Sequence, residues 1–272
     1  MSGTSAARGT GHRLPRAPLA AAAGDPAHAA RLAAAGVDVV VAYHSSVLRR
    51  RGLPSVAGLL PWANANDMTL GVLPRIAARV TDVPVFATVC ANDALRPPED
   101  VVADAAARGA AGVLNAPTVG LLSGRVRRAV ESAGLGFRRE VELMSLARAS
   151  GLRAWGYAFT AGQARSLVAA GAEAIVIHLG ITGVGQPVGR ARRTRATVGT
   201  AARTIRPDVR LLLHGGPIHD PASFVSLAGD LDVGFLGASA FPDDPHLDVT
   251  VREWRAMGVG RPIRETTEGR AV

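Results

Sequence analysis

The sequence predicts an α/β fold, a single (β/α)8 TIM barrel with a short disordered N-terminal tail, and three observations support this prediction. Short apolar runs alternate with segments of helical period, without any linker-like interruption. Eight such units fit a chain of 272 residues, which is close to the usual length of such a barrel. The segments 34–39, 108–113 and 169–174 each place a glycine where a helix ends and a strand begins, as a left-handed C-cap requires. A doubly wound open sheet would show the same alternation, and the length favours the barrel.

The strands are expected where β-branched or apolar residues form short runs. In order they are 17–23, 37–44, 83–89, 111–115, 153–159, 174–179, 209–214 and 233–238. The first run is too short and too rich in alanine to cross a membrane, and we expect a strand there rather than the core of a secretion signal. We therefore expect a flexible basic tail over 1–16, one barrel domain over 17–260 and a flexible C-terminal tail over 261–272.

The helices are expected in the Ala-, Leu- and Arg-rich segments between the strands. In order they are 26–35, 66–79, 98–108, 139–150, 161–170, 195–205, 221–228 and 245–257. Four of them open with a proline in the first turn, where its missing N–H costs nothing.

Three long loops remain, at 45–65, 117–135 and 180–194, and long loops in a compact domain are usually lids or binding loops. The glycines of 180–185 lack the G-x-G-x-x-G order, which favours a lid over a nucleotide site.

Composition excludes several kinds of chemistry. The formal net charge is +9, and all 31 basic residues are arginine. A chain without lysine cannot form a Schiff base or use a P-loop amine, because arginine does not deprotonate. The single cysteine, Cys90, excludes an internal disulfide framework and fits a reducing compartment, so we expect a cytoplasmic protein. Aromatic residues make up 4% and no nucleic-acid motif is present, so we expect no specific nucleic-acid partner and no membrane partner.

In a TIM barrel the active site lies at the C-terminal ends of the strands, so the residues that follow each strand form one candidate set. They are Tyr43, His44, Cys90, Asp93, Asn115, Thr118, Tyr157, His178, His214, Gly215, Gly216, Gly237 and Ser239. We expect His178 and His214 to be catalytic, since an imidazole exchanges protons near neutral pH. The alternative is that each histidine is hydrogen-bonded into the top layer of the barrel.

Glycines after the last two strands offer bare backbone N–H groups. Gly215, Gly216 and Gly237, with Ser239, lie where barrels often hold a phosphate or carboxylate. Tight turns would need the same glycines. Arginines in the three loops would attract an acidic substrate to this end of the barrel, unless they are ordinary solvated charge.

Glu140, near the start of a helix, is the candidate carboxylate base or partner of a histidine. Glu142 points about 200 degrees away on the same helix, so only one of the two faces the barrel mouth. A helix N-terminus alone would also favour an acid there.

His178, His214 and Glu140 are the residue types of a two-histidine, one-carboxylate metal site, but no ligand spacing supports such a site. We expect no cofactor, with a bound divalent metal as the alternative. Cys90 is either a nucleophile or a buried small side chain.

Six short motifs resemble those of the phosphoenolpyruvate hydrolase-like family. They are AGLLPWANAN at 57–66, NAPTVG at 115–120, EVELM at 140–144, HLG at 178–180, HGGPI at 214–218 and GFLGAS at 234–239. The resemblance implies a TIM barrel related to the phosphoenolpyruvate mutase and isocitrate lyase group, often a homo-oligomer, which shares a domain with a plant antiviral resistance protein. We add Asn66, the last residue of the first motif, to the expected substrate-binding residues.

The chain departs from the family pattern at the expected barrel mouth, in the segments 23–25, 44–46, 91–94 and 240–243. We expect a lyase or hydrolase that acts on a small anionic oxo acid or related carbonyl compound and cleaves, hydrates or isomerises a bond beside the carbonyl through an enolate or oxyanion. His178 and His214 would act as acid/base groups or oxyanion donors, Glu140 would orient or accept a proton, and Asn115 would help to hold the acidic end. The alternative is a catalytically silent barrel that binds a small molecule or a protein.

Overall fold

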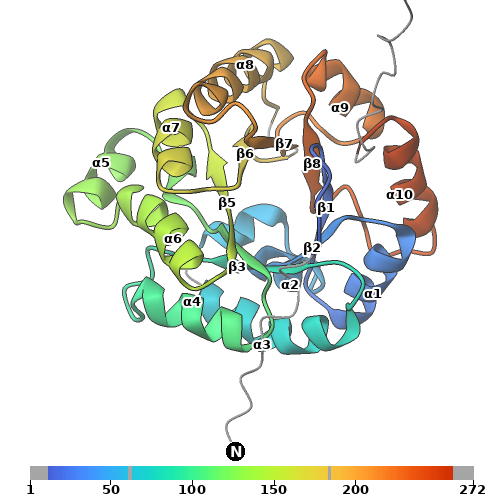
Figure 1. Cartoon of the computed structure of the whole chain (residues 1–272), viewed down its shortest axis with the longest axis horizontal. Coiled ribbons are helices and arrows are strands. Elements are labelled where there is room, and N and C mark those ends of the chain that lie inside the picture. The colour runs from blue at the N-terminus through green and yellow to red at the C-terminus, as the bar shows by residue number, and fades with distance from the viewer. Residues whose placement is uncertain (1–11, 61–62, 183–184, 260–272) are drawn as a thin grey trace, which may run out of the picture.

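The computed structural model describes residues 12–60, 63–182 and 185–259 and confirms the predicted barrel. Eight parallel strands pair in sequence order and close between β8 and β1 (Figure 1). The strands are β1 Leu19–Ala23, β2 Val39–Ala42, β3 Val85–Val89, β4 Gly112–Asn115, β5 Arg153–Ala158, β6 Ala174–His178, β7 Arg210–His214 and β8 Gly234–Gly237. Each strand lies within its predicted range and is shorter than predicted.

The helices form a ring outside the strands (Figure 1). The α-helices are α1 Pro26–Ala35, α2 His44–Arg49, α3 Ala65–Arg79, α4 Pro98–Ala107, α5 Gly124–Ser132, α6 Arg138–Ala149, α7 Ala161–Ala169, α8 Val188–Ile205, α9 Pro221–Ala228 and α10 Leu247–Ala256, and the 3-10 helices are η1 Ser55–Leu59 and η2 Val119–Leu121. None of the helices in the described ranges has the length and apolar character needed to cross a bilayer.

The prediction of three long structureless loops is wrong. The first loop, 45–65, contains α2 and η1, and the second, 117–135, contains η2 and α5. The third, 180–194, ends early because α8 begins at Val188. The helix α2 has six residues, which is too few to show a helical period. The helix α5 is short and rich in arginine, and it buries none of its residues, so it resembles a solvated loop in the sequence.

The strand register decides which side chains reach the pocket at the top of the barrel. In β6, Val176 belongs to the cluster inside the barrel, whereas Ile177 packs against the surrounding helices. Side chains of a strand return to the same face every second residue, so His178 projects inward at the top of β6. The same alternation turns Tyr157 in β5 and His214 in β7 inward. The Cα atoms of the two histidines are partners in the β6–β7 register.

The expected tails, 1–16 and 261–272, lie mostly outside the described residues. Of the described part, Leu14 is buried and joins the cluster inside the barrel. Its carbonyl oxygen accepts a hydrogen bond of 3.1 Å from Arg210, the first residue of β7, and Arg16 forms an ion pair of 2.8 Å with Asp232. Residues 12–16 therefore close the N-terminal end of the barrel, opposite the pocket.

Gly24, directly after β1, allows α2 to lie close to the barrel. A Cβ atom at this position would lie 2.3 Å from the backbone nitrogen of Val47 and 2.4 Å from the carbonyl carbon of Ser46. Because both contacts are backbone atoms, Gly24→Ala would force α2 to move, and we expect the free energy of unfolding to fall by about 1–3 kcal/mol. Urea denaturation measures this change.

The matched control is Gly71→Ala within α3. A Cβ at Gly71 meets nothing within 4 Å, so this variant should gain up to about 1 kcal/mol, because alanine is the better helix former. If both variants were as stable as the wild type, Gly24 would not control the position of α2.

Candidate active site

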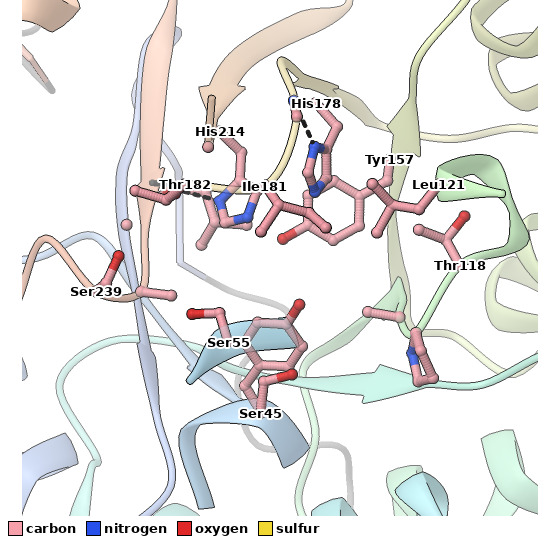
Figure 2. Close-up of a pocket in the computed structure, with 18 of the residues that line it drawn as sticks. Ser45, Ser55, Thr118, Leu121, Tyr157, His178, Ile181, Thr182, His214 and Ser239 are labelled. Carbon is pink, nitrogen blue, oxygen red and sulfur yellow. Dashed lines mark hydrogen bonds between the residues drawn. The ribbon is translucent and has the colours of Figure 1, made fainter. Parts of the chain in front are cut away.

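The C-terminal ends of the strands surround a pocket that collects many of the predicted site residues (Figure 2). Those in its lining are Tyr43, His44, Thr118, Tyr157, His178, His214, Gly215, Gly237 and Ser239. Six predicted residues do not line this pocket: Asn66, Cys90, Asp93, Asn115, Glu140 and Gly216. The pocket therefore assembles the two histidines and separates them from the predicted carboxylate base.

His178 and His214 lie in the pocket with opposite tautomers. The backbone N–H of Gly180 donates to Nδ1 of His178 at 3.1 Å, so a neutral His178 carries its proton on Nε2. Nδ1 of His214 lies 2.8 Å from the carbonyl oxygen of Leu236, which can only accept, so a neutral His214 has its lone pair on Nε2. Figure 2 shows both rings beside the pocket, with the hydrogen-bonded nitrogens turned toward the protein. The site thus offers one imidazole donor and one imidazole acceptor.

Burial keeps both histidines neutral. The pKa of His178 is well below 6.5, because burial disfavours the imidazolium and His214 lies close by. Burial, and to a smaller extent the nearby guanidinium of Arg49, lower the pKa of His214 to about 4. The ring centroids of the two histidines are 4.8 Å apart, and Phe159 stacks on His178 at 4.7 Å. At neutral pH the donor and acceptor roles are therefore fixed.

Two tyrosines and a third histidine complete the floor of the pocket. The hydroxyl of Tyr157 is buried and has no hydrogen-bond partner among the described protein groups. Burial and the neighbouring Tyr43 raise its pKa well above 10, so it stays a neutral donor. His44 bonds through Nε2 to the carbonyl oxygen of Gly58 at 3.1 Å, and burial lowers its pKa to about 4. Tyr157 is thus a buried, neutral donor beside the two catalytic candidates, with the hydroxyl of Tyr43 as its neighbour.

Arg49 is the cation of the pocket, and the sequence did not identify it as a single site residue. It ends α2, where its Nη2 donates to Ser46 at 2.6 Å and its Nη1 donates to Ser55 at 3.2 Å. Burial lowers its pKa below the usual value for arginine, and it forms no ion pair with any carboxylate in the described ranges. Of the arginines in the three segments predicted as loops, Arg49 alone lines this pocket among the described residues. An unpaired, partly buried guanidinium calls for an anionic ligand.

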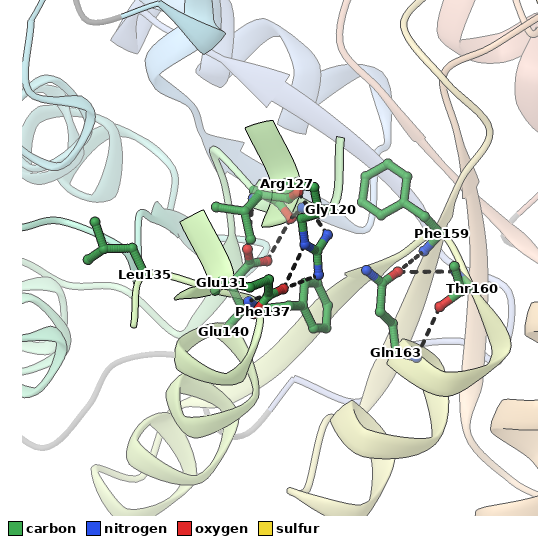
Figure 3. A network of polar contacts seen from close by, with 12 residues as sticks. Gly120, Arg127, Glu131, Leu135, Phe137, Glu140, Phe159, Thr160 and Gln163 are labelled. Atoms are coloured by element: carbon green, nitrogen blue, oxygen red, sulfur yellow. Dashed lines mark hydrogen bonds and ion pairs between the residues drawn. The ribbon is translucent and has the colours of Figure 1, made fainter. Parts of the chain in front are cut away.

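Glu140 lies behind the pocket and organises the loop after β4. It is fully buried, and its carboxylate accepts hydrogen bonds from Asn115, from Thr118 at 2.6 Å and from the backbone N–H of Val119 at 2.8 Å. Figure 3 shows Arg127 beside this network, where its Nη1 donates to the carbonyl oxygen of Val119 at 2.9 Å. Asn115 points away from the pocket as well. Glu140 therefore positions Thr118, which does line the pocket.

Burial raises the pKa of Glu140 from 4.5 to about 7, although three donors favour the ionised form. Between these two values the folded protein binds the proton more tightly than the unfolded chain, so this carboxyl lowers stability as the pH rises from 4.5 through 7. Glu140→Gln removes the titration. As the pH rises from 4.5 through 7, we expect the wild type to lose on the order of 3 kcal/mol of unfolding free energy relative to Glu140→Gln.

Urea denaturation of both proteins at several pH values measures this shift. Glu142→Gln is the control, since Glu142 lies on the same helix with 45% of its side chain exposed. A stability difference between Glu140→Gln and wild type that does not change with pH would contradict the raised pKa.

A second polar cluster lies at the end of β3, away from the histidines. Asn66 accepts a hydrogen bond of 2.8 Å from the backbone N–H of Cys90 and donates to Asp93 at 2.9 Å. Asp93 also accepts from Asn64 at 2.8 Å. Burial raises the pKa of Cys90 to about 11, so its thiol is protonated at neutral pH. These residues hold the start of α3 against β3, and the arrangement favours the buried small side chain over the nucleophile for Cys90.

The glycines after β7 form a tight turn. Gly215 and Gly216 have φ values of 69° and 62°, which favour glycine over other residues. The N–H of Gly216 donates to the carbonyl oxygen of Gly180 at 2.7 Å, so it is not available to an anion. The turn thereby fixes the loop that follows His178, and of the two glycines only Gly215 lines the pocket.

The structure does not assemble the two-histidine, one-carboxylate metal set. Glu140 is committed to the loop after β4 and does not reach the pocket. Within residues 12–60, 63–182 and 185–259, no group of three or more His, Cys, Asp or Glu side chains is placed to hold a metal ion.

Comparison with known proteins agrees with this geometry at the level of fold and family. The model of the family described as phosphoenolpyruvate hydrolase-like matches residues 14–254. The ToMV susceptible protein tm-1(GCR26) of Solanum lycopersicum is 35% identical over 238 residues, which are 83% of this chain and 32% of that protein. The putative transcriptional regulatory protein y4pA of Sinorhizobium fredii is 32% identical, with 77% of this chain and 36% of that protein covered. The chain thus spans about a third of the length of these relatives.

Among solved structures, a phosphonopyruvate hydrolase in complex with oxalate and Mg²⁺ has a similar fold. Its TM-score is 0.54 at 18% identity, and the match covers 81% of this chain and 74% of that one. At this identity the likeness shows the barrel alone.

Proposed function

The chain belongs to the phosphoenolpyruvate hydrolase-like family, and we propose that it is an enzyme acting on a small anionic oxo acid or a related carbonyl compound through an enolate or oxyanion. The observation that carries the proposal is the unpaired guanidinium of Arg49 in the same pocket as a histidine donor and a histidine acceptor. These are the three groups that such chemistry needs: one for the carboxylate, one for the carbonyl oxygen and one for a proton.

Arg49 would bind the substrate carboxylate. Its planar guanidinium can donate two parallel hydrogen bonds to a carboxylate, which fixes both position and orientation. Its bonds to Ser46 and Ser55 hold it at the end of α2 before a ligand arrives. In the empty pocket the partly buried guanidinium has lost part of its hydration without gaining a counter-charge. A ligand carboxylate would supply that counter-charge, which favours binding.

His178 would stabilise the negative charge that develops on the carbonyl oxygen. The hydrogen bond from the N–H of Gly180 to Nδ1 orients the Nε2–H. Because the pKa of His178 is low, the imidazole stays neutral near pH 7 and remains a donor through Nε2. The buried hydroxyl of Tyr157 is a second donor on the same wall, and its ring centroid lies 5.1 Å from that of His178. A preorganised pair of donors in a buried site favours an enolate or oxyanion over the keto ground state.

His214 would accept the proton. Its Nε2 lone pair takes a proton from the carbon next to the carbonyl, or from an attacking water. In the free protein its pKa of about 4 makes it a weak base. A bound anion beside it favours the imidazolium and raises that pKa toward the range in which it can act. Glu140 contributes by holding Thr118 at the pocket wall.

Deuterium exchange tests the enolate step without knowledge of the natural substrate. Pyruvate is incubated with the protein in D₂O, and proton NMR follows the loss of the methyl signal. The proposal expects catalysed exchange that His214→Gln abolishes. A panel of other oxo acids, including phosphorylated and phosphono forms, is assayed in parallel for bond cleavage or hydration.

The alternative, a silent barrel that binds a ligand, predicts a different pattern. Oxo acids or other small molecules would then bind saturably, with neither exchange nor turnover of any compound in the panel. The names of the plant and bacterial relatives state no reaction, so the enzyme is tested against this binding alternative.

A further inference from the structure

The charge inventory of the active-site pocket is unusual for a site that would hold a divalent cation. Its lining contains no aspartate and no glutamate, and Arg49 is its one charged side chain among the described residues. The other polar groups facing it are hydroxyls and the neutral histidines. Before any ligand binds, the pocket therefore carries a net positive charge.

The carboxylates of Asp25, Asp93, Glu140 and Asp243, in the segments that follow β1, β3, β4 and β8, are each bound to other groups. Both oxygens of Glu140 accept hydrogen bonds, from Thr118 and from the backbone of Val119. Asp93 accepts from Asn64 and Asn66 through one oxygen and from the backbone of Leu95 through the other. Asp243 forms ion pairs with Arg31 and Arg50. Asp25 forms an ion pair with Arg50 and accepts hydrogen bonds from backbone N–H groups at the N-terminus of α1. None of these four side chains lines the pocket of the histidines, although Asp93 and Asp243 line adjoining pockets that share His44 and Arg49 with it.

These residues do not fit Mg²⁺. That ion is held by oxygen ligands, chiefly carboxylates, in near-octahedral geometry. Here it would find no protein carboxylate and would lie in the same partly buried pocket as a guanidinium, where two like charges repel strongly. The phosphonopyruvate hydrolase with the similar fold was crystallised in complex with oxalate and Mg²⁺, which makes oxalate a suitable probe for the pocket of this chain.

Arg49 and the donors around it can supply what a cation would. A guanidinium binds a carboxylate through two hydrogen bonds and compensates its charge. The donors at His178 and Tyr157 can take the second oxygen of a planar ligand such as an oxo acid or oxalate. The positive charge that a metal would bring is thus present in the chain itself.

We propose that this pocket binds and activates its oxo acid without a divalent cation, with Arg49 holding the carboxylate and His178 the adjacent oxygen. This inference rests on the proposed function, since it concerns how the same pocket holds the same class of ligand. It assigns to the end of α2 a task that bound metal ions commonly perform in other enzymes.

Isothermal titration calorimetry with oxalate tests the inference. The metal-stripped protein is titrated in EDTA and again in excess Mg²⁺, and the same pair of titrations is run on Arg49→Met and on the control Arg51→Met, an exposed arginine two residues along. We expect the wild type and Arg51→Met to bind with the same Kd in EDTA and in Mg²⁺. We expect Arg49→Met to lose about 100-fold or more in affinity under both conditions. Circular dichroism confirms that the variants are folded.

Two results would overturn the inference and can be told apart. If oxalate binds only in Mg²⁺, the metal-free assignment is wrong while a pocket for oxo acids survives. If neither oxalate nor any oxo acid binds in either buffer, the proposed function fails and the inference falls with it.

Discussion

Replacing Arg49 with methionine should remove substrate binding and leave the fold intact. The guanidinium has no carboxylate partner among the described residues, so its loss breaks no ion pair, whereas a bound oxo acid would lose its counter-charge. We expect kcat/KM for the true substrate to fall by about 100-fold or more, since leaving a buried charge unpaired costs about 2–5 kcal/mol. The melting temperature should stay the same or rise, because an uncompensated cation is removed from a partly buried position.

The comparison with Arg51→Met isolates the effect from general surface charge. Arg51 is exposed in the turn after α2, and its loss lowers the net charge by the same amount. Equal effects of the two substitutions on kcat/KM would show that the arginines act only as a diffuse field. A large drop in melting temperature for Arg49→Met would show that the guanidinium supports the fold instead.

The two histidines should respond differently to glutamine, because their Nε2 atoms have opposite roles. At His178, a glutamine amide can still donate to the carbonyl oxygen and accept from the N–H of Gly180, so His178→Gln should be the milder change, while His178→Ala should lose about 10²–10³-fold in kcat. At His214, glutamine cannot accept and carry a proton, so His214→Gln should lose about 10²–10⁴-fold. Single-turnover rates and deuterium exchange measure both.

The order of these effects is the test. If His178→Gln were as damaging as His178→Ala while His214→Gln kept most of the rate, the assignment of donor and acceptor would be reversed. Unfolding curves of each variant show whether a loss of rate reflects a loss of structure, since both rings are buried against Tyr157.

The barrel could be predicted from the sequence because its signals are local and repeated. Each strand is a short apolar run, and glycine at positions such as Gly36 and Gly171 marks where a helix ends with positive φ. The short helix α2 could not be predicted in this way. Its six residues follow β2 after a single residue, Tyr43, and its apolar and polar residues show no helical period.

The lining of the pocket was predicted in part, because sequence position shows which residues end a strand but not which face each one occupies. His178 and Tyr157 lie on the inner face, whereas Asn115 follows the inner Leu114 and therefore points outward to Glu140. Arg49 was missed as an individual residue. A helical interpretation of 44–49 would have placed it one turn after Ser45, on the same face, and so directed it to the pocket.

A crystal structure of the protein grown with oxalate in the presence of EDTA tests the central claim most directly. We predict one carboxylate of oxalate on the guanidinium of Arg49 and an oxygen of the other within hydrogen-bond distance of Nε2 of His178, with no cation in the pocket. Oxalate bound instead beside Cys90 and Asp93, or a pocket at His178 and His214 that stays empty at saturating oxalate, would contradict the account.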